Sequence, residues 1–297
     1  MTTQRLHPQC ISCLLEKNLK NIPDNFTTVQ KSEYMQGVLK IIGSADNGMS
    51  APEIVGEIRE FKEKFGGVFD YCEIKDYFNR FMLSLENDIW DKIENSQNSL
   101  KMAVKYAMVG NFIDFGAMES VDEQKLKETL ENTDKLIIDD TEYEQFENEI
   151  MKADNIAYLT DNCGEIVLDK LLIKQILKLN SNVKINVIVR GKPVLNDCTI
   201  DDAKQVGMEK IVSVIGNGTS VAGTVLNKIS TEPKAIIDNA DLIISKGQGN
   251  FETLHGCGKN IYYLFLCKCK MFADRFGVEP FKGIFVNDKH LSNFIDD

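Results

Sequence analysis

Long hydrophobic runs are missing from this 297-residue sequence. The longest candidate, residues 261–267, has the length of a strand, whereas a helix needs about 18 apolar residues to cross a bilayer. The first ten residues also lack the apolar core of a secretory signal. We therefore expect a cytoplasmic protein that has no membrane partner.

Basic residues are scarce relative to acidic ones. The sequence has 34 Lys and Arg against 45 Asp and Glu, which gives a formal net charge of −11. A protein that binds nucleic acid generally presents a basic patch to the phosphates, so this composition argues against a nucleic-acid partner. The excess of acid lies entirely in residues 1–150, which hold 16 basic and 28 acidic residues, while residues 151–297 hold 18 and 17.

Histidine is equally scarce, and disulfide bonds are not expected. The three histidines, His7, His255 and His290, are scattered, which argues against a histidine phosphoenzyme or a His-rich metal site. In a reducing cytoplasm the eight cysteines are expected to be thiols or metal ligands. Cys10 and Cys13 form a CxxC motif at the expected start of a helix, a position that lowers the pKa of a thiol.

Three interpretations of this CxxC motif stay open at this point. The two cysteines could be buried packing thiols, a redox pair, or half of a structural metal site. Cys267 and Cys269 are the other close pair in the sequence, but their Cys-x-Cys spacing is less usual for zinc.

The spacing of apolar residues changes near residue 150, which divides the chain into two parts. Apolar residues recur at helical spacing in residues 12–21, 33–42, 51–65, 73–94 and 98–110. Ser50, Pro52 and Glu53 have the spacing of a helix start with a capping box. The acid-rich stretch 119–149 is only weakly periodic and favours a solvated helical hairpin or connector. We expect residues 1–150 to form a helical N-terminal domain.

Residues 151–297 are expected to form a second domain of the α/β class. Strand-sized apolar runs occur at residues 156–159, 185–189, 211–215, 242–245 and 261–266. Segments with a helical or loop pattern separate them, at 165–179, 199–207, 220–239 and 251–257. This alternation predicts βαβ units and a mostly parallel, Rossmann-like sheet.

The unusual polar residues of the second domain follow four successive strands. The segments are 161–165 after the first strand, 190–191 and 196–197 after the second, 216–220 after the third and 246–250 after the fourth. In open α/β sheets the carboxyl ends of parallel strands form the ligand-binding edge. We therefore expect these four loops to converge on one site.

The residue types in these loops suit phosphoryl chemistry. Asp161, Asn162 and Asp197 offer oxygen ligands, which Mg²⁺ or Mn²⁺ prefers. Glycines on either side of Asn217 and Gln248 allow backbone N–H groups to approach an anion. Lys246 and Arg190 bring positive charge to the same edge. The alternative is that such residues are ordinary turn and helix-cap residues, which is the commoner role of each motif alone.

Three further polar residues have two interpretations each. Asn111 and Asp114 continue the apolar stripe of residues 100, 104 and 107 by one helical turn. They either satisfy the backbone at the end of a helix or reach a cleft and bind substrate or a metal-bound water. Glu165 lies one turn into the helix that follows the first strand, where it supports a ligand or contacts a substrate hydroxyl.

Several segments closely resemble the metal-dependent damage-control phosphatase family, formerly the domain of unknown function 89. They are YLTDNCGEIVLDKLLI (158–173), VRGKPVLNDCTIDDA (189–203), DLIISKGQGNFETL (241–254) and GNFIDFGA (110–117). The CxxC of Cys10 and Cys13 resembles the motif of a mostly prokaryotic subfamily. The resemblance extends from residue 8 to near residue 280.

This resemblance implies a helical N-terminal region on an α/β/α sandwich, and hydrolysis of phosphate esters such as sugar phosphates or damaged phosphometabolites. It implies a divalent metal (Mn²⁺, Co²⁺, Ni²⁺ or Mg²⁺) on Asp161, Asn162 and Asp197. A small phosphorylated metabolite would be the partner, with Lys246 in the KGQGN block contacting its phosphate. Gly247, Gln248 and Asn250 of that block, together with Arg190 and Asn217, would complete the substrate site.

Two other functions are compatible with parts of the sequence. A methyltransferase that uses S-adenosylmethionine has a similar sheet, but it needs an acid for the ribose where this sequence has Arg190 and Gly191. A non-catalytic metal or metabolite sensor would use Cys10 and Cys13 as its sensing element. For the phosphatase, attack by a carboxylate and attack by water are both compatible with the residues.

Overall fold

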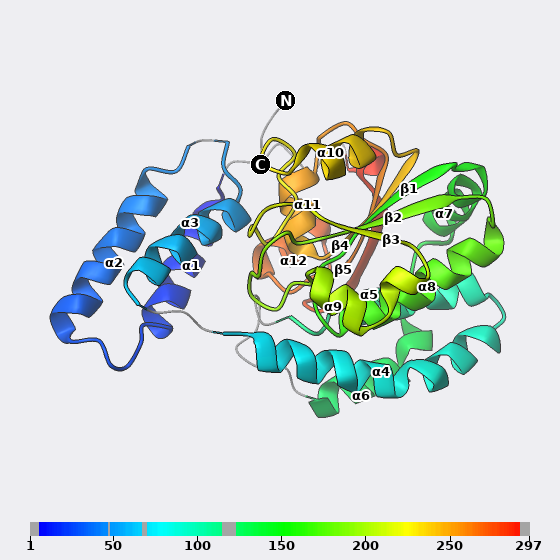
Figure 1. Ribbon diagram of the computed structural model, residues 1–297, viewed down its shortest axis with the longest axis horizontal. Helices are drawn as coiled ribbons and strands as arrows, with labels where there is room; N and C mark the ends of the chain where they lie inside the picture. The colour runs from blue at the N-terminus through cyan, green and yellow to red at the C-terminus, as the bar shows by residue number, and fades with distance from the viewer. Residues whose placement is uncertain (1–5, 47, 67–69, 115–122, 292–297) are drawn as a thin grey trace.

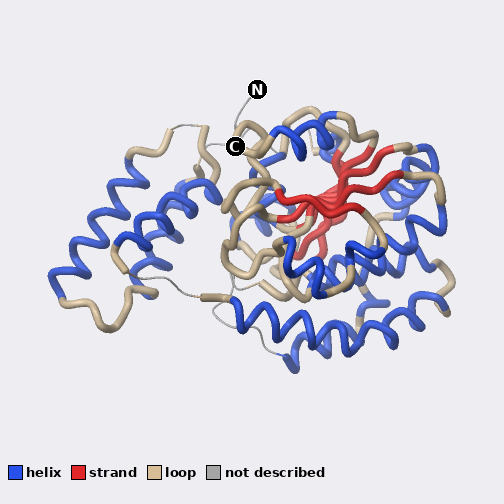
Figure 2. Tube along the Cα trace, in the orientation of Figure 1, coloured by secondary structure: helices blue, strands red, loops and turns tan. Residues whose placement is uncertain are grey.

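A six-stranded sheet forms the centre of the computed structural model, which describes residues 6–46, 48–66, 70–114 and 123–291 (Figures 1 and 2). Its strands are β1 (Asn155–Leu159), β2 (Lys184–Val189), β3 (Ser213–Gly216), β4 (Leu242–Lys246), β5 (Ile261–Leu266) and β6 (Gly283–Asn287). The order across the sheet is β3-β2-β1-β4-β5-β6, and only β6 is antiparallel to its neighbour. The order reverses between β1 and β4, and ligands of such sheets bind outside the carboxyl ends of the strands at this position.

Helices cover both faces of the sheet, so the fold is an α/β/α sandwich. On one face, α5 (Ser99–Gly110) and α8 (Glu165–Leu179) pack against each other and against inward side chains such as Ile156 and Tyr158. On the other face, α10 (Thr231–Asp238), α11 (Gln248–Leu254) and α12 (Lys270–Phe276) cover the alternate side chains, including Ala157 and Leu159. Since alternate residues of each strand enter different cores, both strand faces are apolar, as expected for a buried parallel sheet.

Further helices form an outer layer beside α8 and α5 (Figure 1). The long helix α4 (Cys72–Glu94) packs along α8 and contributes Phe78 and Met82 to the core that the sheet shares. The remaining elements on this side are α6 (Glu123–Glu131), η1 (Thr133–Lys135), α7 (Asp140–Lys152), α9 (Ile200–Gln205) and η2 (Met208–Lys210), of which α7 contacts β6 directly and α9 and η2 contact β3. The short helix η3 (Asp288–His290) follows β6.

The first three helices form a separate unit beside the sandwich (Figure 1). Helices α1 (Pro8–Lys20), α2 (Thr28–Gly43) and α3 (Ala51–Lys64) enclose a small core of their own around Tyr34, Val38 and Ile54. The predicted start of α3 is confirmed: Ser50 and Glu53 form a capping box. The unit contacts the carboxyl edge of the sheet, because Lys228 Nζ lies 2.8 Å from Glu53 Oε1 and the Arg59 guanidinium donates to the carbonyl of Pro193.

The predicted α/β class, the mostly parallel sheet and the helical N-terminal region are confirmed. The acid-rich stretch is more than a solvated connector, because Leu126, Leu130 and Phe146 of α6 and α7 are buried in the shared core. Residues 119–122 of that stretch and 115–117 of the GNFIDFGA segment lie outside the described residues. The domain boundary near residue 150 stays a prediction, and the hydrophobic core is continuous across it. None of the described helices has the length and apolarity that crossing a membrane requires.

Candidate active site

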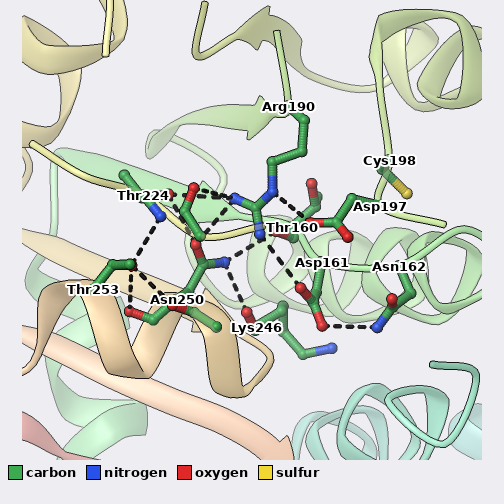
Figure 3. A network of polar contacts seen from close by, with 12 residues as sticks. Thr160, Asp161, Asn162, Arg190, Asp197, Cys198, Thr224, Lys246, Asn250 and Thr253 are labelled. Atoms are coloured by element: carbon green, nitrogen blue, oxygen red, sulfur yellow. Dashed lines mark hydrogen bonds and ion pairs between the residues drawn. The ribbon is translucent and has the colours of Figure 1, made fainter. Parts of the chain in front are cut away.

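The polar residues that follow the strands do converge at the carboxyl edge of the sheet (Figure 3). Asp161 and Asn162 follow β1, while Arg190 follows β2 and Asp197 lies seven residues further on. The backbones of Asn162 and Asp197 form a bridge with each other, which brings the two loops together. Lys246 ends β4, and Asn250 lies in the first turn of α11. The edge therefore carries two carboxylates, two amides and two cations.

Arg190 connects the two aspartates. Its Nε donates to Asp197 Oδ2 at 2.6 Å, and its Nη2 donates to Asp161 Oδ1 at 3.3 Å (Figure 3). Its Nη1 donates to the carbonyl of Gly223 and to Asn250 Oδ1, both at 3.0 Å. The side chain is only 2% exposed. Because its planar fork is directed at protein acceptors, Arg190 fixes the distance and orientation of the two carboxylates.

The amide of Asn162 is oriented so that its carbonyl oxygen, Oδ1, is available as a ligand. Its Nδ2 donates to Asp161 Oδ2 at 2.7 Å and to Glu165 Oε2 at 3.0 Å. Two carboxylate oxygens require the NH₂ group of the amide to face them, so the Oδ1 atom must point the other way. Glu165 lies in the first turn of α8 and is fully buried.

Asn111 ties the end of α5 to the same residues. Its Nδ2 lies 3.1 Å from Asp161 Oδ2 and 3.0 Å from Glu165 Oε2, while its Oδ1 accepts the backbone N–H of Leu266 at 3.1 Å. The amide therefore satisfies backbone and also contacts two residues of the site, whereas substrate binding by Asn111 stays a prediction.

The donor set fits a hard divalent cation. Burial, together with the charges of Asp197 and Glu165, raises the pKa of Asp161 well above its usual range. Burial raises the pKa of Asp197 to about 6, although Arg190 lowers it. Within the described part of the chain, Asn162 Oδ1 and Asp197 Oδ1 accept no hydrogen bond. Two crowded buried carboxylates and a free amide oxygen are the ligands that Mg²⁺ or Mn²⁺ favours, and a cation between them would relieve their repulsion.

Lys246 is more deeply embedded than the sequence indicates. Its Nζ donates to the carbonyl of Ala107 at 2.7 Å, to Glu165 Oε1 at 2.5 Å and to Asp169 Oδ1 at 2.7 Å, and the side chain is 0% exposed. An ammonium has three N–H donors, and all three have protein acceptors. Tyr158 also donates to Asp169 Oδ1, at 2.7 Å. A phosphate contact by Lys246 stays a prediction, and it would require one of these bonds to break.

The loop after β4 packs directly onto Asp161. Gly247 has a φ of +79°, and a Cβ atom placed there would lie 2.1 Å from Asp161 Oδ2. The Nδ2 of Asn250 donates to the carbonyls of Thr160 and Lys246, at 3.1 and 2.8 Å. Gln248 donates from Nε2 to Glu252, and its buried Oε1 has no partner in the described structure. Only glycine allows this loop to approach the carboxylate so closely.

Asn217 joins the loops that follow β2 and β3. Its Oδ1 accepts the N–H groups of Gly191 and Thr219, each at 2.9 Å. Its Nδ2 is buried and has no partner in the described structure. Asn217 therefore holds the loop geometry with one end of its amide and has a donor left at the other end.

The sequence prediction missed one cation at this edge. Lys268 lies two residues beyond the end of β5, and its Nζ is 2.7 Å from Asp114 Oδ2. The signal was present, because the rule applied to the first four strands also applies to the fifth. Asp114 therefore pairs with Lys268, rather than only ending the helical stripe.

The CxxC motif lies on α1, where Cys10 and Glu252 of α11 line one cavity. Contrary to the expectation for a helix start, the pKa of Cys10 is raised to about 12, because burial and the charge of Glu252 outweigh the helix-terminal position. No three His, Cys, Asp or Glu side chains in the described ranges come together as a metal site, and this includes Cys10 and Cys13. All eight cysteines are free thiols.

Comparison with known proteins agrees with this arrangement. The family described as the damage-control phosphatase ARMT1-like domain matches residues 6–283. A damage-control phosphatase of Pyrococcus horikoshii is 35% identical over 241 residues, which cover 79% of this chain and 80% of that protein. A damage-control phosphatase of Archaeoglobus fulgidus is 32% identical over 289 residues, covering 92% and 96%.

A crystal structure of a DUF89 family protein from Pyrococcus horikoshii superimposes with a TM-score of 0.76 at 27% identity. The superposition covers 96% of this chain and 99% of that one. A family match over nearly the whole chain, two relatives above 30% identity and a shared fold lead to one conclusion. The chain belongs to the damage-control phosphatase family with the ARMT1-like domain.

Proposed function

We propose that this protein is a divalent-metal-dependent phosphatase that hydrolyses phosphate monoesters of small metabolites. The observation that carries the proposal is the pair of buried carboxylates, Asp161 and Asp197, held together by Arg190 beside the free amide oxygen of Asn162. The relatives named damage-control phosphatases support the same reaction class. Asp161, Asn162 and Asp197 would hold the metal, and Mn²⁺, Co²⁺, Ni²⁺ and Mg²⁺ are the candidate ions.

The protein residues have distinct tasks in this reaction. When bound, the cation supplies a Lewis acid for a phosphate oxygen and lowers the pKa of a water molecule. Arg190 aligns the two carboxylates and favours their ionised forms, which burial opposes. Glu165 accepts from Asn162 and thereby fixes the direction of the amide oxygen. Lys246 donates to both Glu165 and Asp169, and so holds these two buried acids in place.

Substrate selection is assigned to the helical unit of α1, α2 and α3. This unit contacts the loops after β2 and β3 through Arg59 and Glu53, and so it stands beside the same edge. Asn217 Nδ2 and Gln248 Oε1 are buried polar atoms without partners among the described residues, and they provide one donor and one acceptor for a hydroxyl-rich substrate. A small phosphorylated metabolite, such as a sugar phosphate or a damaged phosphometabolite, fits this combination.

Two subsidiary assignments belong to the same proposal. Cys10 and Cys13 support membership of the CxxC-containing, mostly prokaryotic subfamily. A cytoplasmic location is supported by the eight cysteines, which are all free thiols, as expected in a reducing compartment.

The test is release of inorganic phosphate from an aryl phosphate and a panel of sugar phosphates, with each divalent metal in turn. The wild-type protein should turn over with at least one metal and stop when EDTA is added. Asp161→Asn and Asp197→Asn should each lose about 100-fold or more in kcat/KM. Asp201→Asn, which changes a carboxylate that is 95% exposed, is the matched control. Wild-type turnover in both site variants would refute the proposal.

A further inference from the structure

Lys268 is placed at the site by the strand that ends beside it. Strand β5 runs parallel to β4, so its carboxyl end lies at the same edge as Lys246 and Asp161. The Lys268 side chain is only 3% exposed. Its Nζ lies 2.7 Å from Asp114 Oδ2, and it has no other partner in the part of the chain that the structure describes. Two of its three N–H donors therefore have no acceptor among the described residues.

Short contacts connect Lys268 to the candidate metal ligands. The N–H of Leu266, two residues before Lys268, donates to Asn111 Oδ1, and Asn111 Nδ2 donates to Asp161 Oδ2, each at 3.1 Å. Asp114, the partner of Lys268, follows Asn111 by three residues. Burial above all raises the pKa of Asp161 and of Asp197, and the charge of Asp114 adds to the rise in both. The turn that carries Asp114 and the strand end that carries Lys268 are therefore both tied to Asp161 through Asn111.

Two other buried cations of this edge are already committed to protein acceptors. Lys246 donates its three N–H groups to Ala107, Glu165 and Asp169. The guanidinium of Arg190 donates hydrogen bonds to Asp161, Asp197 and Asn250, and to the carbonyl of Gly223. A phosphate monoester brings up to two negative charges and several acceptor oxygens, and a nearly buried ammonium with spare donors suits such a ligand.

We propose that Lys268 binds the phosphate group, donating to a non-bridging oxygen of the phosphate monoester and of the inorganic phosphate product. Asp114 holds the ammonium in place before the phosphate arrives and competes with the phosphate for it. This inference rests on the proposed phosphatase function and names a residue of the same site.

The test is calorimetric titration of the Mn²⁺-loaded protein with inorganic phosphate. Lys268→Gln should weaken phosphate binding about 10- to 100-fold, the usual effect of losing a charge-assisted hydrogen bond. Lys268→Arg should retain most of the affinity. Lys270→Gln changes an exposed lysine two residues further on and should bind phosphate like the wild type.

Asp114→Asn separates phosphate binding from a purely structural ion pair. If Lys268 binds phosphate, removing the competing charge should leave phosphate affinity unchanged or tighten it, the opposite of Lys268→Gln. If the pair only braces the fold, both variants should lose phosphate affinity together with thermal stability, and the inference is overturned.

Two further measurements separate the phosphate-binding role of Lys268 from the phosphatase function. They are the Mn²⁺ affinity of each variant, titrated without phosphate, and the phosphatase activity of the wild type. Lys268→Gln should bind Mn²⁺ within a fewfold of the wild type. A wild-type protein that turns over, with undiminished phosphate affinity in Lys268→Gln, overturns the inference and leaves the phosphatase function standing. A wild-type protein that neither turns over nor binds phosphate overturns both.

Discussion

Lys246 Nζ lies 2.5 Å from Glu165 Oε1, and both side chains are fully buried behind the candidate metal ligands. The same ammonium lies 2.7 Å from Asp169 Oδ1. A single cation thus pairs with two acids that have no access to solvent. Removing one partner from such a buried group leaves uncompensated charge, which costs more than any exposed ion pair contributes.

Lys246→Met should therefore lower the free energy of unfolding by about 3–5 kcal/mol, measured by urea denaturation. The matched control is Lys259→Met, which breaks a partly exposed pair with Asp238 and should cost no more than about 1 kcal/mol. A cost below 1 kcal/mol for Lys246→Met would show that Glu165 and Asp169 are not held as charged groups by this lysine.

Arg190→Lys should weaken Mn²⁺ binding by about 10- to 100-fold, a typical effect of losing a residue that orients metal ligands. The substitution keeps the charge but cannot reach Asp161 and Asp197 with one planar fork. Calorimetric titration with Mn²⁺ measures the change. Arg80→Lys alters an arginine that is 74% exposed and should have no effect. Equal Mn²⁺ affinity in wild type and Arg190→Lys would contradict the role assigned to Arg190.

Gly247→Ala should abolish most of the phosphatase activity, because the added Cβ would lie 2.1 Å from Asp161 Oδ2. The φ of +79° alone is unfavourable for alanine by about 1–3 kcal/mol. Gly258→Ala supplies the control, since Gly258 has the same φ but no atom within 4 Å of its added Cβ. Both variants should lose stability, and only Gly247→Ala should lose activity. Equal activity in the two would mean that the loop does not need its close approach to Asp161.

Glu252→Gln should reduce the dependence of stability on pH. Burial raises the pKa of Glu252 to about 7, although its hydrogen bond from Gln248 opposes the rise. The folded protein then holds a proton that the unfolded chain releases above about pH 4.5, so stability falls as the pH rises from about 4.5 to about 7. A neutral glutamine does not ionise, so this fall in stability with rising pH should disappear in Glu252→Gln.

At pH 8, Glu252→Gln should be more stable than the wild type by on the order of 1–2 kcal/mol, and below pH 4.5 the two should be equal. Thermal unfolding at a series of pH values measures this difference. Glu232→Gln, on the exposed start of α10, should show no such trend. An identical pH profile for Glu252→Gln and wild type would mean that Glu252 is ionised in the folded protein at pH 6.

The sequence indicated the sheet and its functional edge because both follow from local patterns. The apolar runs at residues 156–159 and 185–189 are long enough to identify strands, and parallel strands place their carboxyl ends together. The convergence of Asp161, Arg190 and Lys246 on one edge follows from that rule.

The missed features depend on contacts between distant parts of the chain. Strand β6 is five residues long and antiparallel, and it is held by pairing with β5. The seven-residue helix α12 carries Met271 and Phe272, which are buried against the core beneath the sheet. Neither has a strong periodic signal of its own.

The environments of individual side chains could not be predicted from the sequence either. A helix start favours a reactive thiol, but the tertiary burial of Cys10 raises its pKa instead. Lys246 could be identified as important from its position, but its three protein acceptors come from α5 and α8. The pairing of Asp114 with Lys268 likewise depends on the segments that follow α5 and β5 meeting in space.

Anomalous diffraction from crystals grown with Mn²⁺ and inorganic phosphate tests the central claim most directly. The account predicts a manganese peak roughly 2.0–2.4 Å from oxygen atoms of Asp161, Asn162 and Asp197, with phosphate density beside it. A manganese peak elsewhere, for example beside Cys10 and Cys13, with none at these three residues, would contradict it.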